Sequence, residues 1–405
     1  MNDVYVVADN IYSPLGATTE ENFNRMTRGI SAVRRHNRPE MADQPFFAAL
    51  FEAAGEVAGR VAGDVAGKAA GRVAGNVAGG VAGNVAGRVA GNVAGGHTKF
   101  ERLLIESIGR VLYDSGVDPA DPRTILIIST TKGNISLLES GIDDPARISL
   151  TGSARLIADY FGFIQPPVVI SNACISGILA LITAMHMIRR GRYDTAVVAG
   201  ADVISRFVLS GFGSFQAISP GRCKPFDQAR DGINLGEGAG AVIVSGSRRY
   251  RGNLRLRGGS VSNDANHISG PSRTGEELAH VITRSLADAG CPAREIDFIS
   301  AHGTATPYND EMEARAITLG QVGAAPVNSL KGYYGHTLGA AGLIESIVTL
   351  QSMREDKVLP SLGYEVNGVT MPLNICTTLM HTPLDHCLKT ASGFGGCNAA
   401  LVMSK

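Results

Sequence analysis

The stretch PPVVISNACISGILALITAMHMIRRG, residues 166–191, places one cysteine, Cys174, between two apolar segments. Residues 168–171 form a short apolar run typical of a buried strand, and residues 175–188 carry apolar side chains at helical spacing. Gly191 then supplies the residue type that most often follows a helix. The sequence therefore predicts a strand, a turn at Cys174 and a helix, which is a unit of an α/β fold.

Cys174 can be interpreted in two ways at this position. A free cysteine is most often a small buried hydrophobe. A thiol at a helix N-terminus, however, faces unpaired backbone N–H groups and the positive end of the helix dipole, and both lower its pKa. We therefore treat Cys174 as a candidate nucleophile whose partners must come from other segments.

Composition excludes several classes of function. The chain has 405 residues, enough for two domains, and its 37 Lys+Arg balance its 37 Asp+Glu, so no bulk charge favours nucleic acid or an anionic membrane. No segment offers the roughly 20 apolar residues of a spanning helix, and the N-terminus lacks the pattern of a signal peptide. Six cysteines are scattered without a CxxC pair, which favours a reduced, cytoplasmic setting.

One low-complexity segment interrupts the chain. Across residues 52–96 the unit V-A-G-x repeats, with glycine at every fourth position from 55 to 95. A helix there would lose roughly 1 kcal/mol per glycine relative to alanine. We predict a mobile insert, with a helix held by packing as the alternative, and we assign it no chemistry.

Outside the insert, predicted strands and helices alternate, which indicates an α/β protein with helix-covered sheets. The segment SRRYRGNLRLRGG separates two halves of similar pattern, predicted as domains of residues 1–247 and 248–405. The predicted strands are residues 4–8, 125–129, 193–202, 239–244, 296–300 and 399–405, and the predicted helices are residues 100–115, 274–289 and 338–353.

Three further stretches carry candidate partners for Cys174. In DFISAHGTATPYND, His302 follows a buried strand, where α/β sites usually form, although such a histidine often serves only the turn. In NSLKGYYGHTLGAAG, Lys331 and His336 lie in a glycine-rich loop before a helix, where a lysine can also be simply solvated. In SGFGGCNAAL, Phe394 lies among glycines and is a candidate movable gate.

Taken together and in this order, the motifs resemble the β-ketoacyl-acyl carrier protein synthases of the elongating type. The likeness covers nearly the whole chain outside the repeat. It implies a thiolase-like αβαβα sandwich of two related halves, usually a homodimer, with a heterodimer as the alternative. The motifs that carry it are NACISG, KPFDQARDGINLGEGAG, DANH, AHGTATPYND, SLKGYYGHTLGAAG and GFGGCN.

The resemblance also implies a mechanism. Cys174 would accept an acyl group from a carrier-protein thioester, with the backbone N–H groups of Cys174 and Phe394 stabilising the oxyanion. His302 and His336 would bind the thioester carbonyl of malonyl-acyl carrier protein during decarboxylation. The resulting carbanion would attack the acyl-Cys174 thioester. This is a decarboxylating Claisen condensation, expected here in fatty-acid elongation.

The resemblance further implies supporting residues. Lys331 would organise the site, and Glu313, with Asp310, would be its acidic partner, which we interpret as a supporting ion pair. Asn398 would fix the gate loop beside Phe394. No cofactor and no metal are implied, because decarboxylation supplies the driving force.

The chain departs from the family pattern in ways that leave alternatives open. Cys397 stands where the elongating enzymes commonly carry threonine, and residues 131–162 look short, so acyl-chain preference stays open. The same chemistry in an aryl polyene or polyketide-like pathway is one alternative. Others are a partner subunit of a heterodimeric synthase, and a thiolase that uses Cys397 as a second cysteine.

Overall fold

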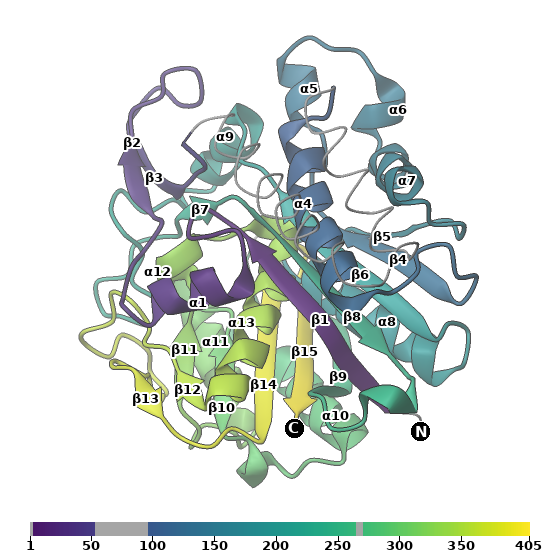
Figure 1. Cartoon of the computed structure of the whole chain (residues 1–405). Helices are drawn as coiled ribbons and strands as arrows, with labels where there is room; N and C mark the ends of the chain where they lie inside the picture. Colours follow the sequence, from purple (N-terminus) through teal and green to yellow (C-terminus); the bar gives the residue numbers. More distant parts are fainter. Residues whose placement is uncertain (1–2, 53–95, 265–269) are drawn as a thin grey trace.

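The computed structural model describes residues 3–52, 96–264 and 270–405 (Figure 1). The V-A-G-x repeat predicted at residues 52–96 lies outside the described residues, apart from Glu52 and Gly96 at its ends.

Two five-stranded runs meet edge to edge in one sheet, whose order within the described residues is β11-β10-β14-β15-β9-β1-β8-β6-β4-β5. The runs join between β1 and β9 through two residue pairs, Val4 with Leu256 and Tyr5 with Arg255. The first run contains β1 (Val4–Tyr12), β4 (Thr124–Ser129), β5 (Val168–Ile170), β6 (Thr195–Asp202) and β8 (Gly238–Ser245). The second contains β9 (Arg255–Asn263), β10 (Phe298–Ala301), β11 (Val327–Ser329), β14 (His386–Gly393) and β15 (Cys397–Ser404).

Both runs repeat the same pattern of strand pairing. Outward from β1, the pairs β1–β8 and β8–β6 are antiparallel, whereas β6–β4 and β4–β5 are parallel. Outward from β9, the pairs β9–β15 and β15–β14 are antiparallel, whereas β14–β10 and β10–β11 are parallel. This repetition is the structural signature of two related halves. The domain boundary at residue 247 stays a prediction.

Helices form three layers around the two runs (Figure 1). In the middle, α8 (Ser176–Arg189) and α13 (Ala341–Glu355) pack against strands of both halves in the largest apolar core. On one outer face, α4 (Lys99–Ser115) and α7 (Leu150–Phe161) cover the first run. On the other, α10 (Glu276–Ala289) and α11 (Pro307–Leu319) cover the second. The predicted αβαβα sandwich is thereby confirmed.

Smaller elements complete the described chain. A short sheet of order β2-β3-β7 lies beside α9, and β12 pairs with β13. The remaining bounds are α1 (Thr19–Met26), β2 (Arg34–His36), β3 (Phe46–Ala49), α5 (Ser136–Glu139), α6 (Pro145–Ile148), α9 (Arg206–Ser214), β7 (Leu235–Gly236), η1 (Arg248–Tyr250), η2 (Ala293–Glu295), α12 (Lys331–Tyr334), η3 (Leu338–Ala340), β12 (Lys357–Val358) and β13 (Met380–His381).

Element ends follow local chemistry. A capping box of Thr98 and Glu101 starts α4, and Gly116 ends it at φ +64°. The helix after Cys174 ends before Gly191 as predicted: Arg190 is the C-cap, and Gly191 follows at φ +67°. The N–H groups of Gly191 and Arg192 donate to the carbonyls of Ile188 and Met187 at 2.9 and 3.0 Å. The helix predicted at residues 338–353 starts as the 3₁₀ turn η3 before it continues as α13.

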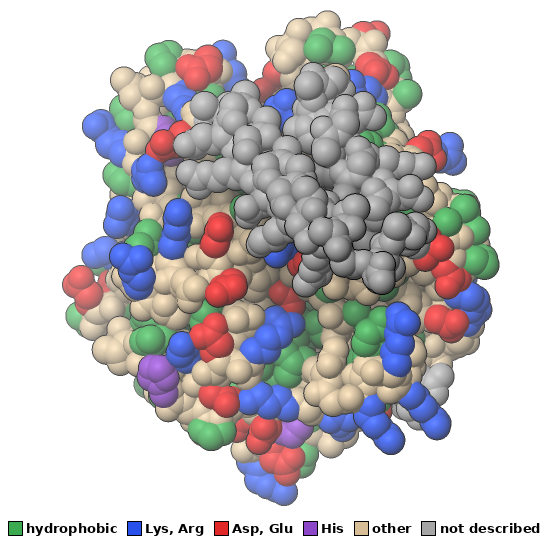
Figure 2. Space-filling view, viewed as in Figure 1, with side chains coloured by type: hydrophobic (Ala, Val, Ile, Leu, Met, Phe, Trp, Pro, Cys, Tyr) green, Lys and Arg blue, Asp and Glu red, His purple; other side chains and the backbone are tan. Residues whose placement is uncertain are grey.

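Within the described residues, every helix is too short or too polar to cross a bilayer. Figure 2 shows lysine, arginine and acidic side chains interspersed over the visible face, which agrees with the balanced charge of the sequence.

The contact between α8 and α13 yields a first prediction. A Cβ at Gly177 would lie 2.3 Å from the backbone nitrogen of Leu343, so Gly177→Ala must push the two central helices apart. We expect the free energy of unfolding to fall by about 2 kcal/mol in urea denaturation. Gly211→Ala in α9 is the control, because its added Cβ meets nothing within 4 Å. Equal effects of the two substitutions would contradict the proposed close packing.

Candidate active site

Cys174 lies in a constrained turn between β5 and α8. The preceding residue, Ala173, has a backbone φ of +43°, a value that residues other than glycine seldom adopt. Ser176 holds this turn, since its Oγ accepts from the N–H of Asn172 at 2.8 Å and donates to the carbonyl of Ala173 at 2.7 Å. The turn directs the Cys174 thiol toward the second half of the molecule.

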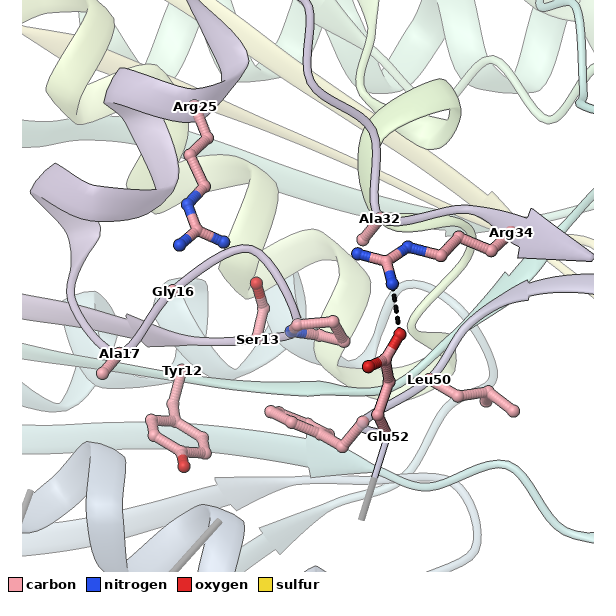
Figure 3. Close-up of a pocket in the computed structure, with 11 residues that line it drawn as sticks. Tyr12, Ser13, Gly16, Ala17, Arg25, Ala32, Arg34, Leu50 and Glu52 are labelled. Carbon is pink, nitrogen blue, oxygen red and sulfur yellow. Dashed lines mark hydrogen bonds and ion pairs between the residues drawn. The ribbon is translucent and has the colours of Figure 1, made fainter. Parts of the chain in front are cut away.

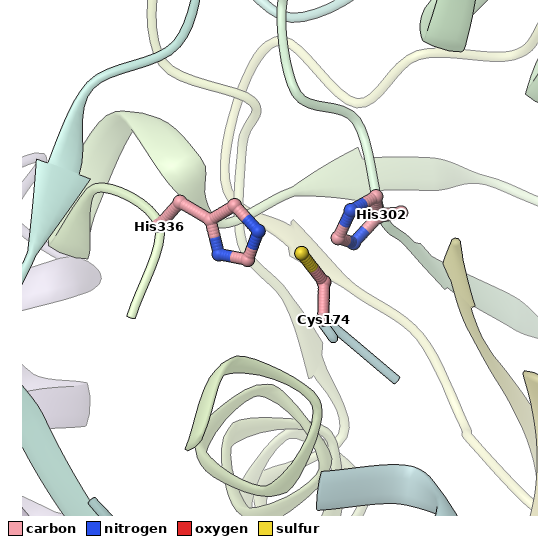
Figure 4. A group of neighbouring side chains, drawn as sticks. All are labelled: Cys174, His302 and His336. Atoms are coloured by element: carbon pink, nitrogen blue, oxygen red, sulfur yellow. The ribbon is translucent and has the colours of Figure 1, made fainter. Parts of the chain in front are cut away.

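Both predicted histidines meet Cys174 (Figure 4). The Cys174 sulfur and one nitrogen from each of His302 and His336 all lie within 4.8 Å of one another. The two rings are nearly perpendicular, with centroids 5.3 Å apart. His302 directly follows β10, and His336 is held beside β7, where its N–H donates to the carbonyl of Asn234 at 2.7 Å. The structure thus gathers residues from three separate segments into one site.

This site opens into a cavity of about 430 Å³. Cys174, His302, His336, Phe394 and Asn398 are among the residues that line it. The remaining predicted site residues, Lys331, Glu313 and Asp310, are fully buried behind the cavity wall. The cavity therefore separates the groups that can touch a substrate from those that act through them.

A second, smaller cavity of about 160 Å³ lies beyond the Tyr12 end of β1 (Figure 3). Arg25 and Arg34 direct their guanidinium groups toward it, Arg34 pairs with Glu52, and the Ser13 hydroxyl is bonded to Asn22. None of the residues predicted for catalysis lines this cavity.

Both histidines of the cavity are neutral near pH 7. Burial lowers the pKa of His302 and of His336 well below the usual value, and the positive charges of Lys331 and Lys389 lower both further. Nδ1 of His336 accepts the N–H of Leu338 at 3.2 Å, so Nε2 carries the ring proton. Among the described residues, that Nε2 has no hydrogen-bond partner, which leaves it available to donate to a bound substrate.

The Cys174 thiol does not have the lowered pKa expected at a helix N-terminus. Burial raises the pKa of Cys174 to about 12, and the nearby Cys397 adds to the effect, whereas Lys331 and the backbone N–H of Phe394 oppose it. The pKa of Cys174 is therefore raised, not lowered as the helix terminus alone predicts, because loss of solvation is the largest effect on the thiol. A neighbouring base must therefore take the thiol proton.

The predicted Lys331–Glu313 ion pair was also wrong. The buried ammonium of Lys331 pairs with Glu345 of α13, and the second oxygen of Glu345 lies 2.8 Å from the ammonium of Lys389. One carboxylate thus neutralises part of the charge of two buried lysines. The prediction failed because Glu313 is already occupied by other donors.

Glu313 and Asp310 instead hold the loop that carries His302. The two oxygens of Glu313 accept the backbone N–H groups of His302 and Gly303, each at 2.8 Å. Asp310 accepts the N–H of Phe226 at 2.7 Å and that of Ala305 at 3.2 Å. These carboxylates fix the backbone at and after His302, so their support is positional.

Lys389 is a site residue that the sequence reasoning missed. Its ammonium donates to the carbonyls of Ser300 and Ala301, each at 3.1 Å, and these residues end the strand before His302. It also donates to its neighbour Thr390 at 2.8 Å. The available signal was a lysine inside the apolar strand HCLKTASG, since a buried strand rarely contains an unpaired charge.

The loop predicted as a gate carries Phe394, whose ring contacts two other aromatic side chains. Phe394 is 36% exposed, and its ring lies 5.5 Å from that of Phe212 and 5.2 Å from that of Phe215. Asn398 accepts the hydroxyl of Ser392 at 2.8 Å and donates to the carbonyl of Gly396 at 3.1 Å, so it is bonded within the gate loop.

Cys397, the alternative second cysteine, is buried and does not line the cavity. Its sulfur faces the carbonyls of Phe394 and Asn172, at 3.5 and 3.8 Å. This placement disfavours thiolase chemistry, which would need Cys397 to reach the substrate.

Cys174, His302 and His336 are also the residue types that bind zinc. The geometry permits a metal ion there, and the absence of a metal and a cofactor stays a prediction.

A thiol and two neutral imidazoles at the meeting point of two related α/β halves define a condensing enzyme that transfers acyl groups. The model of the N-terminal domain of β-ketoacyl synthases matches residues 1–249, and that of the C-terminal domain matches residues 254–365. The chain belongs to the β-ketoacyl synthase family, and it is an acyltransferase.

Individual relatives agree with this assignment. The chain is 29% identical to a putative mitochondrial 3-oxoacyl-[acyl-carrier-protein] synthase of Schizosaccharomyces pombe, over 76% of this chain and 81% of the relative. It is 28% identical to 3-oxoacyl-[acyl-carrier-protein] synthase 2 of Coxiella burnetii, over 76% and 82%. A ketosynthase solved in complex with its chain length factor, from Xenorhabdus doucetiae, shares the fold with a TM-score of 0.81 and 23% identity, covering 100% of this chain and 98% of that chain.

The raised pKa of Cys174 predicts slow alkylation at neutral pH. We expect the rate with iodoacetamide to rise about tenfold for each pH unit between about pH 7 and pH 10, because only the thiolate reacts. Intact mass spectrometry would follow the modification, with Cys174→Ala giving the background from the five other buried cysteines. Fast alkylation that does not depend on pH would show that the thiolate is already formed.

The shared carboxylate predicts an order of stabilities. Glu345→Gln leaves two buried ammonium groups without a counter-charge, and we expect the free energy of unfolding to fall by roughly 3–5 kcal/mol. Lys389→Met should lower the free energy of unfolding by less, because the ion pair between Lys331 and Glu345 survives. Urea denaturation of the two variants would measure this order, and a larger loss for Lys389→Met would contradict it.

Proposed function

We propose that the chain condenses an acyl group held on Cys174 with malonyl-acyl carrier protein, releases CO₂ and forms β-ketoacyl-acyl carrier protein in fatty-acid elongation. The observation that carries the proposal is the convergence of a nucleophilic thiol and two neutral imidazoles at one cavity. The thiol accepts the acyl group, and the imidazole N–H groups donate hydrogen bonds to the developing enolate.

In the first half-reaction, the Cys174 thiol must lose its proton as it attacks the acyl thioester. His302 is a better proton acceptor than His336. Among the described residues, Nδ1 of His302 has no hydrogen-bond partner, so its tautomer is not fixed, whereas Nδ1 of His336 accepts the N–H of Leu338. The tetrahedral oxyanion is held by the backbone N–H groups of Cys174 and Phe394. The carrier thiol leaves with the proton, and the acyl group stays on Cys174.

In the second half-reaction, the malonyl thioester carbonyl accepts hydrogen bonds from the N–H groups of His302 and His336. The carbon–carbon bond to the malonyl carboxylate breaks and CO₂ leaves. The electron pair of that bond stays on the remaining fragment and forms the enolate. The enolate carbon attacks the acyl-Cys174 carbonyl, and the Cys174 sulfur departs. Neutral donors suit this step, because they stabilise the new charge without protonating the carbanion beforehand.

The proposed partner is an acyl carrier protein, as the names of the relatives at 28–29% identity indicate. These names also favour fatty-acid elongation over a polyketide-like pathway. The likeness to a ketosynthase with a chain length factor supports only the fold at 23% identity, so we propose a homodimer with a heterodimer as the alternative. Six free cysteines favour a reducing, cytoplasmic location.

Intact mass spectrometry with a panel of acyl-carrier proteins tests this function. We expect an acyl adduct on the parent protein and none on Cys174→Ala, and we expect malonyl-carrier protein to discharge the adduct as CO₂ is released. The chain length that loads best would define the preferred substrate. A folded protein that accepts no acyl group would contradict the proposal and would favour a partner subunit.

His336→Ala separates the two half-reactions. We expect this variant to keep its acyl adduct while CO₂ release from malonyl-carrier protein falls by about 10²- to 10³-fold, the typical effect of losing one oxyanion donor. Loss of acylation with unchanged CO₂ release would assign His336 to the first half-reaction instead.

A further inference from the structure

A second group of metal-ligating side chains lies outside the catalytic cavity. One ligand atom from each of Cys291, Glu295 and His386 lies within 4.8 Å of the other two. Cys291 follows α10, Glu295 ends η2, and His386 begins β14. None of the three lines the catalytic cavity, and the proposed function uses none of them.

Two of these side chains are held in place by their surroundings. The N–H of Cys291 donates to the carbonyl of Leu286 at 3.0 Å, and the thiol is buried. Nδ1 of His386 lies 2.7 Å from the hydroxyl of Ser404, and the N–H of His386 donates to Asp297 at 2.9 Å. A hydrogen bond at one ring nitrogen is the usual arrangement around a metal-bound histidine, because it orients the ring and fixes its tautomer.

The third side chain can adjust. The side chain of Glu295 is 46% exposed, and its ion pair with Arg294 at 3.7 Å is an exposed one. Such pairs contribute little to stability. The carboxylate can therefore rotate toward the thiol and imidazole at small cost.

The donor set indicates the metal. A thiolate, an imidazole and a carboxylate match the protein ligands of zinc, with water at the fourth tetrahedral position. Neighbouring ligand atoms around tetrahedral zinc are roughly 3.4–3.6 Å apart, and these three lie within 4.8 Å of one another, so the group needs at most roughly 1.4 Å of closure. The thiolate and Glu295 together would balance the charge of a divalent ion, while Asp297 and Arg257 are the nearest further charges acting on Cys291.

We propose that Cys291, Glu295 and His386 bind a zinc ion that joins the end of α10 to the start of β14. The role of this zinc is structural, because the ion would link the end of an outer helix to the strand that carries Lys389 and leads to Phe394. Its occupancy stabilises the second half of the molecule.

Zinc titration of the Cys174→Ala protein tests the site, because that substitution removes the thiol of the competing Cys174, His302 and His336 group. We expect one zinc ion per chain by elemental analysis after dialysis, a melting temperature higher by several degrees, and a thiolate charge-transfer band when Co²⁺ replaces zinc.

Second substitutions in the Cys174→Ala background assign the ligands. Cys291→Ser and His386→Asn should abolish the bound ion, and Glu295→Gln should weaken binding about tenfold or more. His280→Asn on the exposed face of α10 is the matched control and should retain the ion. If the Cys291→Ser protein does not fold, loss of the bound ion in His386→Asn and the Co²⁺–thiolate band are used to assign the ligands. A chain that binds no zinc, or binding that survives His386→Asn, would overturn the proposal. These readouts do not depend on condensing activity.

Discussion

The buried carboxylate of Glu345 is the interaction on which the site depends. It pairs with both Lys331 and Lys389, and each lysine is bound to a segment that carries a catalytic histidine. Lys331 begins the helix before His336, and Lys389 holds the carbonyls that precede His302. Burial is the main cause that keeps both imidazoles neutral, and the two ammonium groups add to it. Their positive charge also favours an enolate, so the same residues contribute to geometry and electrostatics.

Duplication explains why the site forms where it does. The two halves repeat one pattern of strand pairing, and they enclose α8 and α13 in a shared core. Cys174 comes from the first half, before α8, whereas His302 and His336 come from the second. Glu345 lies on α13 itself, so the central helix layer supports the carboxylate that pairs with the lysines behind both histidines. A residue such as Gly177, which allows α8 to approach α13 closely, therefore affects catalysis only through the packing of this layer.

Sequence patterns and the family likeness could predict the residues that line the cavity and the buried Lys331, Glu313 and Asp310, but not how the buried charges pair. Cys174 and His302 stand at the ends of apolar strands, where α/β sites form, and the family likeness supplied His336. Glu345 was missed because a single carboxylate in an apolar helix is usually exposed on the surface. That it pairs with Lys331 is decided by tertiary packing, which the local sequence does not show. Lys389 was missed for the same reason. The pKa of Cys174 was mispredicted because burial is a property of the assembled halves, not of the local turn.

The most direct test of this account is the titration of His302 and His336 by NMR in protein with ¹³C-labelled histidine, assigned with His302→Ala and His336→Ala. The account predicts that both imidazoles are still neutral at about pH 6.5, where an ordinary histidine is half protonated, since burial and the two lysines lower their pKa values well below the usual one. Titration of either ring near its ordinary pKa of about 6.5 would contradict the claim that burial, together with Lys331 and Lys389, sets the protonation state of the site.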